Sequence, residues 1–77
     1  PPLHTHSIAI FAAVLAMSFT LEVVIFSPAR RASRKLLERV VEFITVAGGA
    51  SRICEYNQEA CRVYAYDGGK SLIRSFP

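Results

Sequence analysis

Residues 7–26, SIAIFAAVLAMSFTLEVVIF, are the stretch on which the fold depends. Sixteen of these twenty residues are apolar, and Glu22 is their only charge. At a rise of about 1.5 Å per residue, a helix of this length matches a hydrocarbon core about 30 Å thick. Transfer of the Ile, Leu, Val and Phe side chains into lipid outweighs one off-centre carboxylate. The run therefore predicts a single transmembrane helix over residues 7–26.

Two other interpretations of this run remain open. A secretory signal peptide would place basic residues before a shorter apolar core, whereas residues 1–6, PPLHTH, contain no Lys or Arg. A helix buried inside a soluble assembly would be equally apolar. Because the chain starts with Pro-Pro and lacks an initiator Met, we expect a processed, imported protein.

The whole chain carries more apolar side chain than a unit of its size can bury. Its 77 residues are 52% apolar and 19% charged, and the mean hydropathy is +0.32. A domain this small leaves much of its surface in water, so lipid or another protein must cover the excess. These values exclude a multidomain enzyme, a disordered tail and a disulfide-dense toxin.

The charge that follows the run predicts its orientation. Residues 27–35 carry four cations and no acid, namely Arg30, Arg31, Arg34 and Lys35. The positive-inside rule places this side in the cytoplasm, matrix or stroma, where the cations would bind anionic phospholipid headgroups. We therefore expect a mitochondrial inner-membrane protein with its N-terminus in the intermembrane space and its C-terminus in the matrix. The thylakoid membrane is the alternative.

Two faces of the expected helix indicate contact with protein. One is a stripe of small residues that would let a neighbouring helix approach closely: Ala9, Ala12, Ala13, Ala16 and Thr20. On nearly the opposite face lie Ser18 and Glu22, an intramembrane polar pair. Such a carboxylate either pairs structurally with a neighbour or lies on an ion path, and the structural interpretation is favoured.

The rest of the chain divides into a helix and a tail. Residues 27–47 have helical periodicity, with Ser27-Pro28 as a start signal and Gly48-Gly49 as a stop. Residues 48–77 form an extramembrane tail with a hairpin, built from strands at 62–66 and 70–76 around a turn at 67–69. The predicted fold is mainly α, without an independent globular core. It consists of one transmembrane helix, an amphipathic helix and an extended or hairpin-like tail.

Candidate chemistry is sparse. A disulfide between Cys54 and Cys61 is feasible, but the predicted orientation places both on a reducing side, so we expect free thiols. His4 and His6 lack a third metal ligand, and Ser33 follows a short Arg-Arg-x-Ser pattern typical of kinase sites. Catalytic, cofactor and metal motifs are missing, so we expect a non-enzyme without a cofactor of its own, with bound lipid as a ligand to consider.

The function predicted from the sequence is that of a non-catalytic, single-pass accessory subunit. Its host would be a multisubunit organellar energy-converting membrane complex, such as a respiratory complex or an ATP synthase. The partners would be other membrane subunits and anionic phospholipid, whereas the balanced charge of residues 48–77 argues against nucleic acid. Two alternatives remain: a free single-span regulator of a pump or channel, and a small secreted protein with a signal-like N-terminus.

Overall fold

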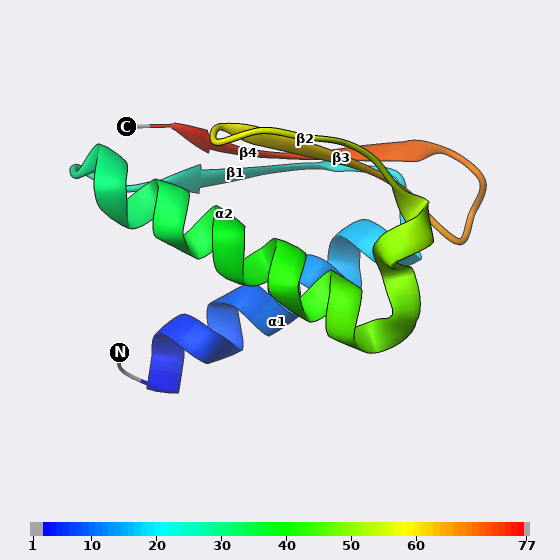
Figure 1. The fold of residues 1–77 in the computed structure, drawn as a ribbon, viewed down its shortest axis with the longest axis horizontal. Helices are drawn as coiled ribbons and strands as arrows, with labels where there is room; N and C mark the ends of the chain where they lie inside the picture. Colours follow the sequence, from blue (N-terminus) through cyan, green and yellow to red (C-terminus); the bar gives the residue numbers. More distant parts are fainter. Residues whose placement is uncertain (1–2, 77) are drawn as a thin grey trace.

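Two helices cover one face of a four-stranded mixed sheet in a computed structural model of the chain, which describes residues 3–76 (Figure 1). In chain order the elements are α1 (Leu3–Ser18), β1 (Glu22–Phe26), α2 (Arg30–Ile44), β2 (Ile53–Tyr56), β3 (Ala60–Tyr64) and β4 (Lys70–Phe76). A π-helical turn (Thr45–Gly49) and a 3-10 turn (Ala50–Arg52) join α2 to β2.

The sheet has the strand order β1-β4-β3-β2. β4 runs parallel to β1, with Val24 beside Arg74, and antiparallel to β3, with Cys61 beside Ile73. The β3–β4 pair is the hairpin that the sequence predicts. It is not a free tail, because it contributes the two central strands of the sheet.

The transmembrane helix predicted over residues 7–26 is wrong. α1 ends at Ser18 after 16 residues, about 24 Å at the usual rise per residue, and the last part of the run is strand β1. Among residues 3–76, no helix combines the length and the apolar character that a membrane crossing requires. The β-branched residues Val23, Val24 and Ile25 favour the extended backbone that β1 adopts.

The C-terminal end of α1 is fixed by residues far along the chain. The buried Ser71 hydroxyl lies 2.8 Å from the carbonyl oxygen of Ala16 and 2.7 Å from that of Phe19, and it accepts the Leu21 N–H at 3.1 Å. The Tyr66 N–H donates to the Met17 carbonyl at 2.7 Å. Carbonyls that a helix end leaves unpaired are therefore bonded to the start of β4 and the residues after β3.

A second contact holds the turn between α1 and β1. The Asp67 carboxylate accepts the Thr20 N–H at 2.8 Å, the Thr20 hydroxyl at 2.5 Å and the Gly69 N–H at 3.2 Å. These bonds lower the pKa of Asp67, with the Thr20 hydroxyl as the largest cause. Gly69 is required by the close approach, because a Cβ there would collide with Thr20.

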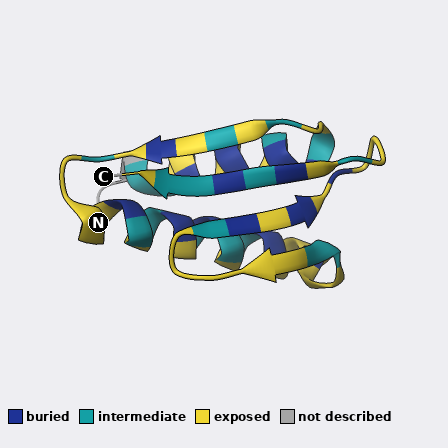
Figure 2. Cartoon of the chain, turned by 90° about the horizontal axis from the view of Figure 1, so that it is seen from above, coloured by how far each residue is buried: buried dark blue, intermediate teal, exposed yellow. Residues whose placement is uncertain are grey.

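A shared core lies between the helices and the sheet, which corrects the expectation of a fold without one. Leu37, Val40 and Ile44 of α2 are fully buried, at the spacing of a single helix face. They pack with the buried sheet residues Cys61, Val63 and Ile73 and with the alanines of α1. Viewed from above (Figure 2), buried residues alternate with exposed ones along β3 and with intermediate ones along β4, as expected for a sheet covered on one face.

The amphipathic helix predicted over residues 27–47 is present but shorter at its start. α2 begins at Arg30, and its N-cap residue, Ala29, offers no side-chain cap. Ser27 is not the N-cap, although its hydroxyl accepts the Ala29 N–H at 3.3 Å. At the other end, the helical path continues through the π-helical turn to the two glycines, where Gly48 has a φ of +85°.

Replacing the Ser71 hydroxyl should destabilise the whole fold. In Ser71→Ala the Leu21 N–H and the carbonyls of Ala16 and Phe19 lose a buried partner, at a cost of about 1–3 kcal/mol in the free energy of unfolding. Urea denaturation followed by circular dichroism measures this loss. The control is Ser51→Ala, because Ser51 is exposed and its loss should cost less than about 0.5 kcal/mol. Equal midpoints for both variants would contradict the role of Ser71.

The Asp67 carboxylate should make stability depend on pH. Because its pKa is lower in the folded chain, its contribution is complete above the unfolded pKa of about 3.9 and is lost as the pH falls through the folded pKa. Asp67 is the only aspartate in the sequence, so its carboxyl carbon can be followed directly by NMR titration. Thr20→Val should raise the measured pKa, and Asp67→Asn should flatten the acid side of the stability profile. An ordinary aspartate pKa in the native chain would exclude this coupling.

Candidate functional site

A hollow lined by apolar side chains lies between α1 and strand β1. It encloses about 310 Å³, near the lower limit for ligand pockets. Its walls and floor are almost entirely apolar side chains from three elements: Ile8, Phe11, Ala12 and Leu15 of α1, Val23, Val24, Ile25 and Phe26 of β1, and Leu36 and Val40 of α2. We call this hollow the α1–β1 groove.

Beside the groove, α1 turns large apolar side chains outward. Its alanines face the core, whereas Phe11 is 63% exposed, Val14 55% and Ile8 50%. The helix carries no Asp, Glu, Lys or Arg on either side. A helix that is apolar all round is normally buried, so this outer face is a candidate contact surface.

A smaller apolar hollow of about 230 Å³ lies on the other flank of α1. It is lined by Ile10, Ala13, Val14 and Met17 of α1 together with Phe43, Val46 and Ala47 near the end of α2. α1 therefore forms a ridge between two apolar hollows. We call the combined area the α1 ridge surface.

One end of the α1–β1 groove is basic. A neighbouring hollow of about 320 Å³ shares Ile25, Phe26 and Leu36 with the groove and adds Lys35 and Arg39. Arg39 Nη1 lies 3.0 Å from His6 Nδ1, and Arg39 Nε lies 3.6 Å from a Glu42 oxygen. Lys35 is exposed and has no ion-pair partner within residues 3–76. The groove thus passes from an apolar part to a cationic end.

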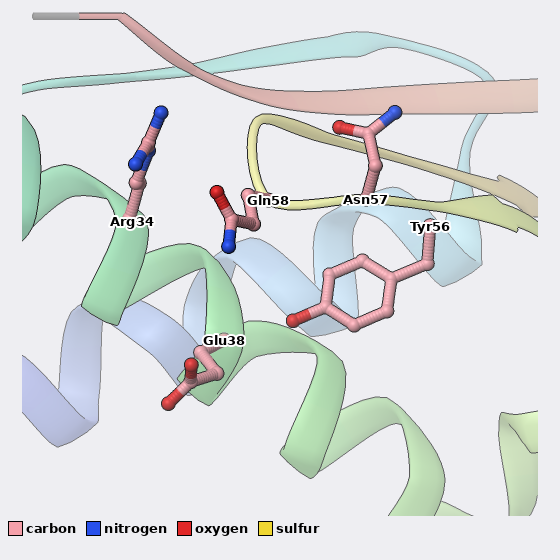
Figure 3. A pocket seen from close by; sticks show the side chains of 5 residues that line it. All are labelled: Arg34, Glu38, Tyr56, Asn57 and Gln58. Atoms are coloured by element: carbon pink, nitrogen blue, oxygen red, sulfur yellow. The ribbon is translucent and has the colours of Figure 1, made fainter.

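A polar hollow of about 300 Å³ lies on the far side of α2, between that helix and the β2–β3 turn. Figure 3 shows the side chains of Tyr56 and Gln58 extending from the strand side toward α2, where Glu38 lines the hollow. Arg34 borders it and is already bound to a Glu59 oxygen at 2.9 Å. The Asn57 side chain is also occupied, because its oxygen accepts the N–H groups of Glu59 and Ala60.

The polar hollow is lined by one phenol, one carboxylate, one guanidinium and two amides. Partial burial, and next the Glu38 carboxylate, raise the pKa of Tyr56, so its hydroxyl stays protonated. The five residues that line the hollow include no Ser, Cys, Lys or His that could act as a nucleophile beside a base. Among the described residues, no group of three or more His, Cys, Asp and Glu side chains could hold a metal ion.

The residues predicted as membrane features lie elsewhere than expected. The alanine stripe packs inside the chain's own core, and Thr20 binds Asp67. Ser18 is the last residue of α1, whereas Glu22 begins β1, so they do not share a helix face. Glu22 is exposed and pairs with Arg74 Nε at 2.6 Å.

The other sequence candidates are also scattered. The cations Arg30, Arg31, Arg34 and Lys35 lie along the first turns of α2, where Arg34 is bound by Glu59. Ser33 is buried and donates to the Arg30 carbonyl, so its hydroxyl is hidden from a kinase. Cys54 is exposed, Cys61 is buried, and no bond joins them in the structure. The side chain of His4 lies outside the described part of the chain.

Sequence reasoning did not identify the α1–β1 groove. Ile8, Phe11 and Leu15 were assigned to lipid together with Val23, because one continuous helix was expected. The signal that could have separated them is the β-branched cluster at residues 23–25, which favours a strand. Comparisons with protein-family models, curated proteins and solved structures find no match to this chain.

The two thiols should differ sharply in reactivity. Cys54 is exposed, whereas burial, and next the nearby Cys54, raise the pKa of Cys61 to about 11. A thiol-specific reagent at pH 8 should therefore modify one cysteine rapidly in the native chain and both after denaturation. Cys54→Ser should abolish the fast phase, and Cys61→Ala should preserve it. A rapid second phase in the native chain would contradict the burial of Cys61.

Proposed function

We propose that this chain is a non-catalytic subunit of a larger protein assembly, and that the α1 ridge surface is where a partner binds. The observation that carries the proposal is the distribution of side chains around α1. Its alanines and Met17 face the core, whereas Ile8, Ile10, Phe11 and Val14 face outward beside two apolar hollows. Burying an apolar surface in a partner supplies the main driving force of protein association.

Folding alone does not account for the outer face of α1. Phe11 and Val14 are more than half exposed, so they add little to the chain's own core. A polar residue at either position would leave the alanine packing against α2 unchanged. Contact with a partner gives these side chains a role, and it would also remove them from water.

The site chemistry also favours binding over catalysis. The α1–β1 groove has no polar side chain in its lining, and in the polar hollow Arg34 and Asn57 already have partners while the Tyr56 phenol stays protonated. Glu38 could act as a base there, but neither hollow places a Ser, Cys, Lys or His nucleophile beside it.

The cellular setting predicted from the sequence stays a prediction. An organellar energy-converting complex as host, a mitochondrial inner-membrane location and contact with anionic phospholipid all agree with a subunit that needs a partner. Anchoring by a single transmembrane helix is not proposed, because α1 is too short. Instead, we propose that protein contacts made through α1 hold the accessory subunit in its complex.

Polar substitution of the ridge should release the chain from its assembly. Phe11→Gln combined with Val14→Gln should change the free energy of unfolding by less than about 1 kcal/mol, because both side chains are largely exposed. In extracts of the native cells, native electrophoresis should show wild-type chain in a large species and the double variant as a small one. Urea denaturation of the purified variant verifies its folding.

The matched control is Tyr56→Gln, which changes an exposed aromatic residue on the opposite edge of the sheet. This variant should remain in the large species. The proposal is wrong if the wild-type chain migrates alone, or if the folded double variant stays in the large species.

A further inference from the structure

Strand β1 has an unpaired edge. It lies at the end of the strand order, and β4 is its only neighbour in the described sheet. The Leu72 N–H donates to the Leu21 carbonyl at 3.1 Å and the Ser27 N–H to the Phe76 carbonyl at 3.3 Å, so odd-numbered residues of this segment direct their backbone groups to β4. The backbone N–H and C=O groups of Glu22, Val24 and Phe26 therefore point away from the sheet.

The two edge strands of the sheet differ in how well they are protected against the addition of a further β-strand. The other edge strand, β2, has four residues, a bulge between Ile53 and Glu55, and mostly exposed side chains. Such short and irregular edges discourage the addition of a further strand. β1 has the sequence EVVIF, with no bulge, Pro or Lys, and its Val, Ile and Phe residues favour strand pairing. β1 is thus the edge that is open to a partner.

The α1–β1 groove lies on the helix side of this edge. The side chains of Val23 and Ile25 point to that side, and Ile8, Phe11 and Leu15 form the opposite wall. A strand added to β1 would direct every second side chain into the groove and the others to the open face of the sheet. The groove is apolar beside Val23 and Ile25, so it selects apolar side chains at two alternate positions.

The next inward-facing side chain of the added strand, beyond the one opposite Ile25, would lie near positive charge. Ser27, Lys35 and Arg39 line the hollow that continues the groove beyond Ile25 and Phe26. Lys35 has no acidic partner in the described chain, and the nearby N-terminal end of α2 adds the positive end of a helix dipole. A carboxylate is the side chain that complements this position.

From these observations we infer that β1 binds an extended segment of a partner protein by antiparallel strand addition. The segment has the pattern acidic-x-apolar-x-apolar, in which the acidic side chain lies opposite Ser27 near Lys35. The two apolar side chains lie opposite Ile25 and Val23 in the α1–β1 groove. This inference rests on the proposed function and specifies how the partner engages one flank of the α1 ridge surface.

The test uses the full chain and a fluorescent six-residue peptide, acetyl-Glu-Thr-Ile-Thr-Val-Thr-amide. Fluorescence anisotropy should show saturable binding, and amide hydrogen exchange should slow at Val24 and Phe26, whose N–H groups face the added strand. Methylating the threonine amides of the peptide should abolish binding, because these N–H groups pair with β1 while the groove side chains stay unchanged. Binding without protection of Val24 and Phe26 would overturn strand addition.

Variants of the chain separate backbone pairing from charge. Val24→Pro removes one outward N–H that β4 does not use, and it should weaken binding about tenfold, whereas Val24→Thr keeps the N–H and should retain binding. The substitution Lys35→Glu should weaken binding of the Glu-containing peptide about fivefold. The variant protein should instead bind more tightly to a peptide with Lys in place of that Glu. An unchanged preference in Lys35→Glu would overturn the acidic position.

Other occupants give different results. If Val24 becomes protected in the chain alone as its concentration rises, a second copy of the chain pairs with β1 and the inference is wrong. If anionic phospholipid vesicles displace the peptide and bind the wild-type chain and the Val24→Pro variant equally well, a lipid surface covers the groove and the inference is wrong. If peptide binding fails although Phe11→Gln/Val14→Gln disrupts the native assembly, the proposed function stands and strand addition is excluded.

Discussion

The hydroxyl of Ser71 is the contact on which the rest of the structure depends. It lies against the carbonyls of Ala16 and Phe19 and accepts the Leu21 N–H, so one buried side chain fixes the end of α1 and the approach to β1. Asp67, four residues earlier, fixes the turn between them through Thr20. Because both residues belong to the C-terminal hairpin, the chain from the end of α1 through β1 adopts its path only when residues 67–76 are in place. A small fold with such distant contacts is expected to form and unfold as one cooperative unit.

Local patterns predicted the parts of the fold that local forces determine. The helix at 30–44 follows from apolar residues at helical spacing, and the β3–β4 hairpin follows from two alternating segments around Asp67-Gly68-Gly69. The division of residues 7–26 into a helix and a strand does not follow from such patterns. The apolar content of this segment is equally compatible with a lipid-spanning helix, a buried helix and a buried strand. The deciding partners, Asp67 and Ser71, lie about fifty residues away and are ordinary polar residues in the sequence.

The sequence does not predict the α1–β1 groove, again because contacts between distant parts of the chain create it. A transmembrane helix would have placed Phe11 and Val23 on one continuous lipid-facing surface, whereas the fold sets them on two elements that face each other across a groove. The alanine stripe shows the reverse effect. Its small side chains do permit close helix approach, but the neighbour is α2 of the same chain rather than another subunit. Sequence periodicity indicates which residues share a face, and only the fold determines what that face meets.

The uncovered surface and the unpaired strand edge have a common origin in this topology. β1 joins the sheet beside the C-terminal strand, so it becomes an edge strand, and α1 lies beneath it without closing over its outer side. Lysine or proline within the strand would protect such an edge, and polar residues on the outside of α1 would make that helix compatible with water. The sequence instead has EVVIF at the edge and Phe11 and Val14 on the helix. The core takes only Ile25 from this strand, with Val23 packed against it, and lies between the helices and the face of the sheet that they cover. Val24, Phe26, Phe11 and Val14 stay exposed. Stability of the isolated chain therefore does not explain these four residues, whereas a partner that covers both the edge and the ridge does.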